Sequence, residues 1–416
     1  MICVLLYKKY VIINEITGGF MKQVVKDKKI TIGIFNDSFY PMADGVIMVV
    51  DNYARRLLKY ANVIVFVPSY IGKSYDDTKL PYKVVRCYSL KVPFLDYSLP
   101  LPKLDRKFNK ELNKYKLDIV HIHSPFTLGV AGLKYAKKHH VPCIATMHSQ
   151  FKRDFKKAVK SEFLSTKLND KLMKVFNKCT ECWAVNSELA RLYYEDYKCK
   201  RLPRVMNNAT EMMPVKDVRK ARNYINKKYN IKDNEKVFLF VGRINTLKNI
   251  IFIVDALKVV KYKEPKLKFK MLYVGSGQDY QKLKNHIKKL NMEKDIVLCG
   301  KVTDRELLKY YYARSDLFLF PSVYDASSIV QIEAASQSTP TLLLKNTVTA
   351  GTVIDNVNGF LSEYTVGAYS DRIIDIMNDK KLYERVSKNA YIDLYKTWDE
   401  MVDKAYKLYI EHINKK

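Results

Sequence analysis

The sequence predicts an α/β protein made of two doubly wound, Rossmann-like domains that face each other across a cleft. Short buried-strand patterns alternate with amphipathic helical patterns along almost the whole chain, as expected of parallel strands joined by crossover helices. The 416 residues are too many for one ordinary hydrophobic core and suit two domains of about 200 residues each. Residues 201–215, which contain Asn207 and Asn208, separate the two runs and are the best candidate for a linker.

The first half of the chain contains six runs rich in β-branched, aromatic or other apolar residues, which favour strands. They are Ile30–Phe35, Val63–Val67, Lys83–Arg86, Ile119–His123, Pro142–Met147 and Cys182–Asn186. Helical patterns lie between them, at Val46–Lys59, Leu104–Lys114 and Leu128–Lys138. We therefore expect a first domain over residues 30–205. Residues 1–29 form an N-terminal extension, and the sequence leaves open whether residues 1–20 are translated or the protein starts at Met21.

The second half repeats the scheme, so we expect a second domain over residues 206–395. Its strand patterns are Val237–Val241, Lys268–Val274, Ile296–Leu298, Leu317–Phe320 and Thr341–Leu344, and its helical patterns are Ile250–Val260, Tyr280–Leu290, Asp304–Ala313 and Ile329–Gln337. The last pattern, Trp398–Ile413, has apolar residues on one side only. Residues 396–416 are therefore expected to form a helix that packs back towards the first domain.

The charge of the chain is strongly positive, at +30 overall. Residues 1–210 hold 37 Lys and Arg against 18 Asp and Glu, a net +19. Such a field attracts phosphate-rich partners, namely nucleic acid, a nucleotide or an anionic membrane, although a solvated lysine-rich surface explains the charge equally well. No apolar run reaches the roughly 18 residues of a membrane span, and the first 20 residues do not form a signal peptide.

The seven cysteines are irregularly spaced, which argues against a disulfide framework and for a reducing compartment. We therefore expect a cytoplasmic protein, with peripheral association at the inner face of the cell membrane as a further option. Cys179 and Cys182 form a lone C-x-x-C, for which two core positions are a better reading than zinc binding or redox chemistry.

Candidate functional residues follow the predicted strands, because ligands of doubly wound sheets bind at the carboxyl ends of the strands. Gly45 lies at a helix start after the first strand, where a glycine lets the backbone approach a sugar or a phosphate. His148 directly follows the strand that ends at Met147. His121 and His123 alternate on one strand, and we expect His123 to face the cleft and His121 to lie in the core. No Asp or Glu nearby has a metal-like spacing, so no metal site is expected here.

In the second half, Arg243 and Lys248 lie between a strand end and a helix start. A guanidinium fork, an ammonium and free helix N–H groups together predict a diphosphate clamp. Gly275 and Gly277 follow another strand, but position 280 is Tyr, so the segment is not G-x-G-x-x-G and supports a nicotinamide cofactor weakly. Two acids eight positions apart, Asp325 and Glu333, follow the next strand and can accept hydrogen bonds from sugar and ribose hydroxyls.

The set of motifs, in order, resembles retaining family 4 glycosyltransferases of the GT-B fold. It comprises Phe39-Tyr40-Pro41 with Gly45, Asp118 to Pro125, Thr146-Met147-His148, Gly242-Arg243 with Lys248-Asn249, Gly275-Ser276-Gly277, and Asp325-x7-Glu333-Ala334. The match spans roughly residues 30 to 410. Within the family the chain looks similar to bacterial enzymes that glycosylate lipids such as diacylglycerol.

This resemblance implies roles for the residues. The first domain would bind the acceptor, with His123 and Tyr40 on the acceptor side, and the second the nucleotide sugar. Gly45 would lie against the donor diphosphate or sugar, His148 near the reacting sugar, Gly275 in the donor site, and Arg243 and Lys248 on the leaving diphosphate. Asp325 would contact the donor sugar and Glu333 the ribose. The family's first acid is Glu, and its Gly-Phe-Gly is here Ala326-Ser327-Ser328, which leaves the donor sugar open.

The expected reaction moves a hexose from a nucleotide sugar, with UDP-glucose favoured, to a hydroxyl of a membrane lipid or cell-surface glycan. It needs no cofactor and no dedicated metal. The departing diphosphate develops negative charge that fixed cations stabilise. A GT-B sugar epimerase or phosphorylase is the alternative, and a basic nucleic-acid-binding protein is less well supported because no binding module is present. No nucleic-acid partner is therefore expected.

One further segment indicates where such an enzyme works. Residues 151–178 hold nine Lys or Arg against three acids, interleaved with bulky apolar residues such as Phe155 and Phe163. A basic helix with an apolar face can lie in an anionic membrane interface, although part of that face could instead pack on the first domain.

Overall fold

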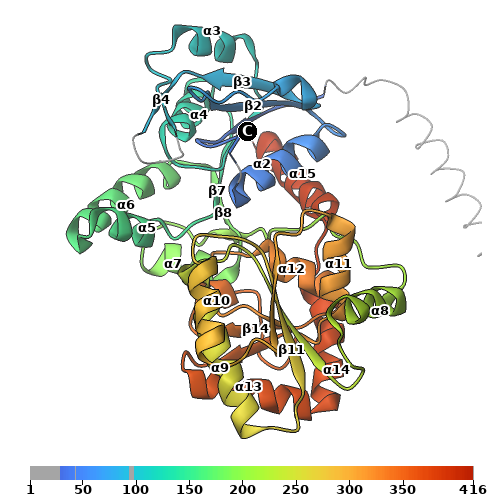
Figure 1. The fold of residues 1–416 in the computed structure, drawn as a ribbon. Helices are drawn as coiled ribbons and strands as arrows, with labels where there is room; N and C mark the ends of the chain where they lie inside the picture. Colours follow the sequence, from blue (N-terminus) through green and yellow to red (C-terminus); the bar gives the residue numbers. More distant parts are fainter. Residues whose placement is uncertain (1–28, 43, 93–97, 416) are drawn as a thin grey trace, which may run out of the picture.

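The computed structural model describes residues 29–42, 44–92 and 98–415, so the N-terminal extension lies almost entirely outside the described residues. The chain forms two parallel α/β sheets of seven and six strands, one above the other in Figure 1. This architecture confirms the predicted fold class of two doubly wound domains.

The first sheet has the order β3-β2-β1-β6-β7-β8-β9, with every pair parallel. Its strands are β1 Thr31–Phe35, β2 Asn62–Pro68, β3 Lys83–Cys87, β6 Ile119–Ile122, β7 Cys143–Met147, β8 Glu181–Ala184 and β9 Arg204–Val205. The six predicted strands of the first half are all present. The linker prediction is wrong in one respect, because β9 lies inside residues 201–215 and pairs with β8.

In the described residues, six α-helices and one 3-10 helix accompany the first sheet. They are α2 Gly45–Leu57, α3 Arg106–Lys114, α4 Thr127–Lys138, α5 Phe151–Val159, α6 Glu162–Phe176 and α7 Ser187–Glu195, with the short 3-10 helix η1 Asp77–Lys79. A separate antiparallel pair, β4 Ser89–Lys91 and β5 Ser98–Pro100, lies at its edge. The Asp44 side chain caps α2 by accepting a hydrogen bond from the Ile47 N–H, which fixes where the loop after β1 ends.

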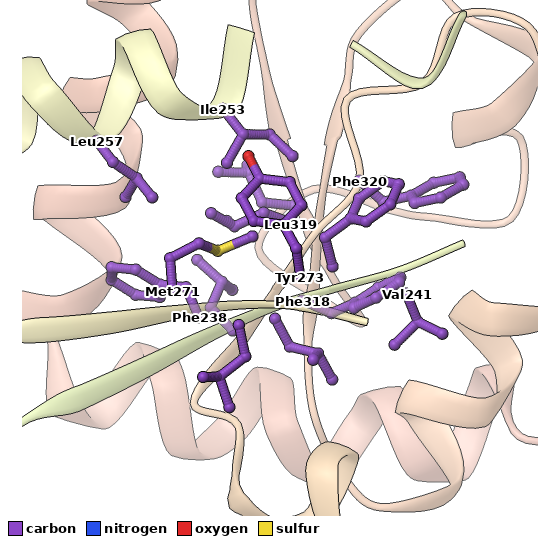
Figure 2. Close-up of a cluster of buried hydrophobic side chains, with 14 of the residues drawn as sticks. Phe238, Val241, Ile253, Leu257, Met271, Tyr273, Phe318, Leu319 and Phe320 are labelled. Carbon is purple, nitrogen blue, oxygen red and sulfur yellow. The ribbon is translucent and has the colours of Figure 1, made fainter. Parts of the chain in front are cut away.

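The second sheet has the order β12-β11-β10-β13-β14-β15, again parallel. Its strands are β10 Lys236–Val241, β11 Phe269–Val274, β12 Ile296–Gly300, β13 Leu317–Leu319, β14 Thr341–Leu344 and β15 Phe360–Ser362. Its helices are α8 Val218–Tyr229, α9 Ile250–Lys263, α10 Tyr280–Lys289, α11 Arg305–Arg314, α12 Ile329–Ser336, α13 Val366–Asn378 and α14 Lys380–Asn389. Figure 2 shows Ile253 and Leu257 of α9 facing side chains of β10, β11 and β13, which form the core of this half.

The last helix, α15 Trp398–Asn414, lies beside α2 in Figure 1 and shares its core. Trp398, Val402 and Tyr409 are buried among residues of β1, β2 and α2. The ring of Tyr409 stacks on Trp183 of β8, with 5.6 Å between the ring centroids. The end of the chain therefore completes the hydrophobic core of the first half.

Candidate active site

Both sheets have a switch point, where the strand order reverses and where ligands of doubly wound sheets bind. In the first sheet it lies between β1 and β6, and in the second between β10 and β13. Gly45 and His123 follow the strands of the first switch point, and Arg243 and Asp325 follow those of the second. The structure thus brings the predicted residues to the strand ends at which chemistry is expected.

Three histidines form a row at the ends of β6 and β7, in which His121 and His123 are buried and His148 is partly buried. The ring nitrogens His123 Nδ1 and His148 Nε2 lie 3.0 Å apart, a hydrogen-bonding distance. His121 is tied to the core, with Nδ1 at 2.5 Å from the Tyr409 hydroxyl and Nε2 at 2.7 Å from Thr146 Oγ1. Burial lowers the pKa of His121 and of His148 to about 3 and that of His123 well below its usual range. All three rings are therefore neutral at physiological pH.

The His123 Nε2 atom is buried and has no hydrogen-bond partner among the described residues. A buried polar atom of this kind costs free energy unless a ligand or water completes its bonding. His123 and His148 both line the large cavity of the first half, so a ligand can reach this row.

Asp37 organises the same strand ends. Its carboxylate accepts hydrogen bonds from the Ser124 and Thr127 hydroxyls and from the N–H groups of Leu128 and Gly129 at the start of α4. These donors oppose the effect of burial, which raises the pKa of Asp37 overall. Because Asp37 occupies the N-terminus of α4, the loop after β1 is held against the loop after β6.

A cavity of about 1260 Å³ opens beside the histidine row. It follows one face of α4, which contributes Thr127, Val130, Ala131, Lys134, Tyr135 and Lys138. Another part of the wall is one face of α6, with Leu168, Lys171, Leu172 and Val175. Asp37, His123 and His148 lie at the α4 N-terminal end, so one end of the cavity is polar and the rest is mainly apolar.

Gly45 and Tyr40 differ in how they relate to this site. A Cβ atom built on Gly45 would meet nothing within 4 Å, so the space in front of the α2 N-terminus is open. Tyr40 is instead engaged within the first half, where its hydroxyl donates to Asp51 Oδ2 at 3.0 Å and its ring stacks on Tyr75. The structure does not bring Tyr40 into the lining of the cavity.

At the second switch point Lys248 forms an ion pair with Asp325 Oδ1. The Ser322 hydroxyl donates to Asp325 Oδ2 at 2.5 Å, and Asn249 Nδ2 donates to the Pro321 carbonyl at 2.7 Å. The two charged side chains are about four-fifths buried, whereas Arg243 is exposed. The cation and the carboxylate that the sequence predicted for one site therefore touch, although 77 residues separate them in the chain.

Glu333 on α12 is buried and has both oxygens paired. Arg305 Nη2 lies 2.6 Å from Oε1, and the Tyr312 hydroxyl donates to Oε2 at 3.0 Å. Neither partner was indicated by the sequence, because each lies on α11 and meets Glu333 only through the packing of α11 against α12. A ligand hydroxyl would donate a further hydrogen bond to a Glu333 carboxylate that Arg305 and Tyr312 already hold in place.

Close packing between two loops requires a glycine at position 275. Its φ is +152°, and a Cβ atom there would lie 1.9 Å from the Gly242 carbonyl oxygen. The loops after β10 and β11 can approach this closely only because position 275 has no side chain.

The two halves meet next to these residues. Gln150 Nε2, two positions after His148, donates to the Tyr324 carbonyl at 3.1 Å, one position before Asp325. On α5, Arg153 donates to the Val323 carbonyl, and Asp154 accepts a hydrogen bond from the Tyr324 hydroxyl. The strand end that holds His148 is thereby fixed against the loop that holds Asp325. Sequence reasoning missed this contact, since α5 carried only a basic, amphipathic pattern.

Within the described ranges, no three His, Cys, Asp or Glu side chains gather as a metal site requires. Every described helix is too short or too polar to cross a bilayer.

Comparison with known proteins identifies the family. Residues 43–211 match the model "Glycosyltransferase Family 4", and residues 221–393 match "Glycosyl transferases group 1". The chain is a family 4 glycosyltransferase. Like other members of the group, this glycosyltransferase transfers a sugar from a nucleotide-sugar donor, which decides against a nicotinamide-dependent oxidoreductase.

Two curated relatives extend along most of the enzyme. The alpha-monoglucosyldiacylglycerol synthase of Streptococcus pneumoniae is 26% identical over 381 residues, which cover 86% of this chain and 83% of the relative. The enzyme with the same description from Acholeplasma laidlawii is 25% identical over 410 residues, 92% of this chain and 98% of the relative.

Solved structures share the fold. A glycosyltransferase from Rickettsia africae superimposes with a TM-score of 0.70 at 19% identity, covering 93% of this chain and 99% of that one. Anabaena HepE, solved in complex with UDP-glucose, superimposes with a TM-score of 0.68 at 15% identity, covering 91% of this chain and 99% of that one. The glycosyltransferase therefore has the GT-B fold.

Proposed function

We propose that the enzyme is a retaining hexosyltransferase that moves glucose from UDP-glucose to a hydroxyl of a membrane lipid. The observation that carries the proposal is the contact between Gln150 and Tyr324, because it brings the His148 strand end and the Asp325 loop into one site. The donor is suggested by the structural neighbour that was solved with UDP-glucose, and the lipid by relatives described as alpha-monoglucosyldiacylglycerol synthases.

In this proposal Lys248 lies between the Asp325 carboxylate and the leaving diphosphate. It is paired with Asp325 and, together with Arg243, would receive the charge that develops on the departing diphosphate. Asp325 would accept hydrogen bonds from sugar hydroxyls and Glu333 from the ribose. The neutral His148 would lie against the reacting sugar, whose anomeric carbon gains oxocarbenium character as the C–O bond breaks. Gly45 would allow the donor to approach the α2 N-terminus, and Gly275 would support the donor site by its packing.

The proposal assigns a different ligand to each half of the chain. The first half, residues 30–205, would bind the acceptor, and residues 206–395 the donor, with 396–416 fastening the two together. The acceptor hydroxyl would enter beside His123, whereas Tyr40 would hold the loop after β1 through Asp51.

A membrane location is supported by the hairpin of α5 and α6. The side chains of Phe163 and Leu164 are 70% and 43% exposed at the start of α6, while Leu172, Met173 and Phe176 are buried further along it. Part of the apolar face therefore packs on the first half, and part remains available for an anionic bilayer.

The proposal is tested by incubating the purified enzyme with radiolabelled UDP-glucose and vesicles that contain diacylglycerol and anionic lipid. We expect label in the organic phase as an α-linked glucolipid, identified by the anomeric proton coupling. An epimerised sugar nucleotide, or sugar 1-phosphate formed only with inorganic phosphate, would instead establish one of the alternative GT-B activities. Label confined to water-soluble glycans would overturn the lipid acceptor while leaving the transferase intact.

A further inference from the structure

The cavity beside the histidines is elongated, and its shape follows from helix geometry. The lining residues of α4 recur at positions 127, 130, 131, 134, 135 and 138, which is a single stripe along the helix. The twelve residues of α4 span eleven rises of about 1.5 Å, which makes this wall roughly 16 Å long. The cavity therefore extends away from His148 along the full length of α4.

Apolar side chains of both helices line the cavity. Val130 and Ala131 come from α4, and Leu168, Leu172 and Val175 come from α6. The volume of 1260 Å³ exceeds the roughly 300–1,000 Å³ that is usual for small-ligand sites. A sugar or a glycan would leave its hydroxyls unpaired against such walls, at a cost for each group. The lining instead matches a hydrocarbon chain.

The rim adds a second argument for an amphiphile. Leu99, Leu104 and Phe126 line the cavity and are 44%, 75% and 38% exposed, so the apolar lining continues to the surface. Lys103, Lys134 and Lys171 also line it and would face a negatively charged lipid surface. A chain entering from a bilayer would therefore meet apolar side chains from the surface inwards.

We propose that this cavity holds one hydrocarbon chain of the acceptor, with the acceptor hydroxyl at the end where His123, His148 and Asp37 lie. The orphaned His123 Nε2 atom would then hydrogen-bond the polar head of the acceptor. The inference rests on the proposed lipid acceptor and deepens it, because chain length becomes a determinant of specificity: each buried CH₂ raises the affinity about fourfold.

The test is to fill the cavity about one third of the way along α4 with Ala131→Phe. Transfer from UDP-glucose to a long-chain diacylglycerol in mixed micelles should fall by about tenfold or more in kcat/KM, while a diacetyl acceptor, whose chains end before the obstruction, keeps its rate. Ala158→Phe is the matched control, because Ala158 is exposed on α5 and does not line the cavity. Leu168→Trp, which enters from α6, should act like Ala131→Phe if the first variant folds poorly.

A binding measurement separates this inference from the proposed function. A fluorescent fatty acid should bind the wild-type protein and lose at least tenfold in affinity with Ala131→Phe but not with Ala158→Phe. Chain binding without any lipid glycosylation would overturn the proposed function and leave the hydrocarbon site standing. Equal losses for long and short acceptors, or unchanged fatty-acid affinity in the filled variant, would overturn the hydrocarbon site itself.

Discussion

At the scale of single residues, Lys248 carries the most direct prediction. Lys248→Ala removes the cation that we place on the leaving diphosphate and leaves Asp325 without its ion pair. We expect turnover to fall by about 10²-fold or more, as for other lost charge-stabilising donors. Lys261→Ala, which removes a partly exposed ion pair with Asp295, is the control. Normal turnover of a folded Lys248→Ala protein would exclude Lys248 from the diphosphate site.

We expect substitution by alanine to affect thermal stability differently at Gly45 and at Gly275. Gly45→Ala places a methyl group in open space, so the melting temperature should stay the same or rise, while kcat/KM for the donor falls by about tenfold or more if the donor occupies that space. Gly275→Ala drives a methyl group into the Gly242 carbonyl and should lower the melting temperature. Thermal melts and steady-state rates decide both cases. Unchanged donor kinetics in Gly45→Ala would show that the donor does not approach α2.

The buried histidines predict a loss of stability in mild acid. Because the pKa values of His121 and His148 are about 3 when folded and near 6.5 when unfolded, the unfolded chain binds more protons between these values. The effect is absent above pH 6.5, where both states are neutral, and destabilises the fold as pH falls, by about 1.4 kcal/mol per histidine and pH unit. The raised pKa of Asp37 acts in the opposite direction at lower pH.

Urea unfolding at pH 7.5 and 5.5 measures this effect. The midpoint should drop at pH 5.5, and His148→Asn should reduce the drop by about one third, because one of three rings is removed. The control is His140→Asn, since His140 is exposed and has φ of +53°, a conformation that Asn accepts. A midpoint that does not move between the two pH values would contradict a neutral, buried row.

At the scale of elements, the α5–α6 hairpin has two functions that separate along its length. Lys160, at φ +51°, ends α5, and Ser161 caps α6. On one side α5 holds the Asp325 loop through Tyr324, over whose ring Lys157 Nζ lies 3.8 Å from the centroid. On the other side the exposed Phe163 and Leu164 begin α6. A single basic stretch in the sequence therefore serves a contact between halves and an outer surface.

Phe163→Ser tests the outer surface. If Phe163 enters the bilayer, the dissociation constant for anionic vesicles should rise by about tenfold or more, because burial of such a side chain contributes about 1.5–3 kcal/mol. Tyr262→Ser is the matched control, since Tyr262 of α9 is even more exposed, at 86%. Sedimentation at low and high salt measures binding, which should fade with salt. Equal effects of the two substitutions would remove α6 from the membrane surface.

Strands that leave a long apolar run in the sequence could be predicted, and most of the shortest strands could not. All eleven predicted strands are present because buried parallel strands leave continuous apolar runs in the sequence. The two-residue β9 and the three-residue β4, β5 and β15 leave no such run. The positions of the candidate site residues at strand ends were predictable for the same topological reason. Their partners were not: Asp37 bonds to Ser124 and to the start of α4, 87 to 92 positions away, and only tertiary packing brings these groups together.

At the scale of the whole molecule, α15 predicts how the two halves depend on each other. Deleting residues 398–416 removes Trp398, Val402 and Tyr409 from the first core and leaves the second core complete. Hydrogen exchange should then accelerate by at least 100-fold in β1 and α2 and change little in β10 and β11, because the lost apolar burial amounts to several kcal/mol. Equal protection of β1 in the full-length and shortened proteins would show that α15 is dispensable.

The position of α15 also governs the order of events on the ribosome. Domains generally fold as they emerge, N-terminal first, at about 5–20 residues per second. Here the first sheet emerges early but lacks a wall of its core until residues 398–409 have been synthesised. The nascent first half must wait, with apolar surface uncovered, while the entire second half is translated. A cell that makes this enzyme consequently has most need of a holdase chaperone during that interval. A stop codon late in the message would, for the same reason, destabilise the half of the protein that was synthesised first.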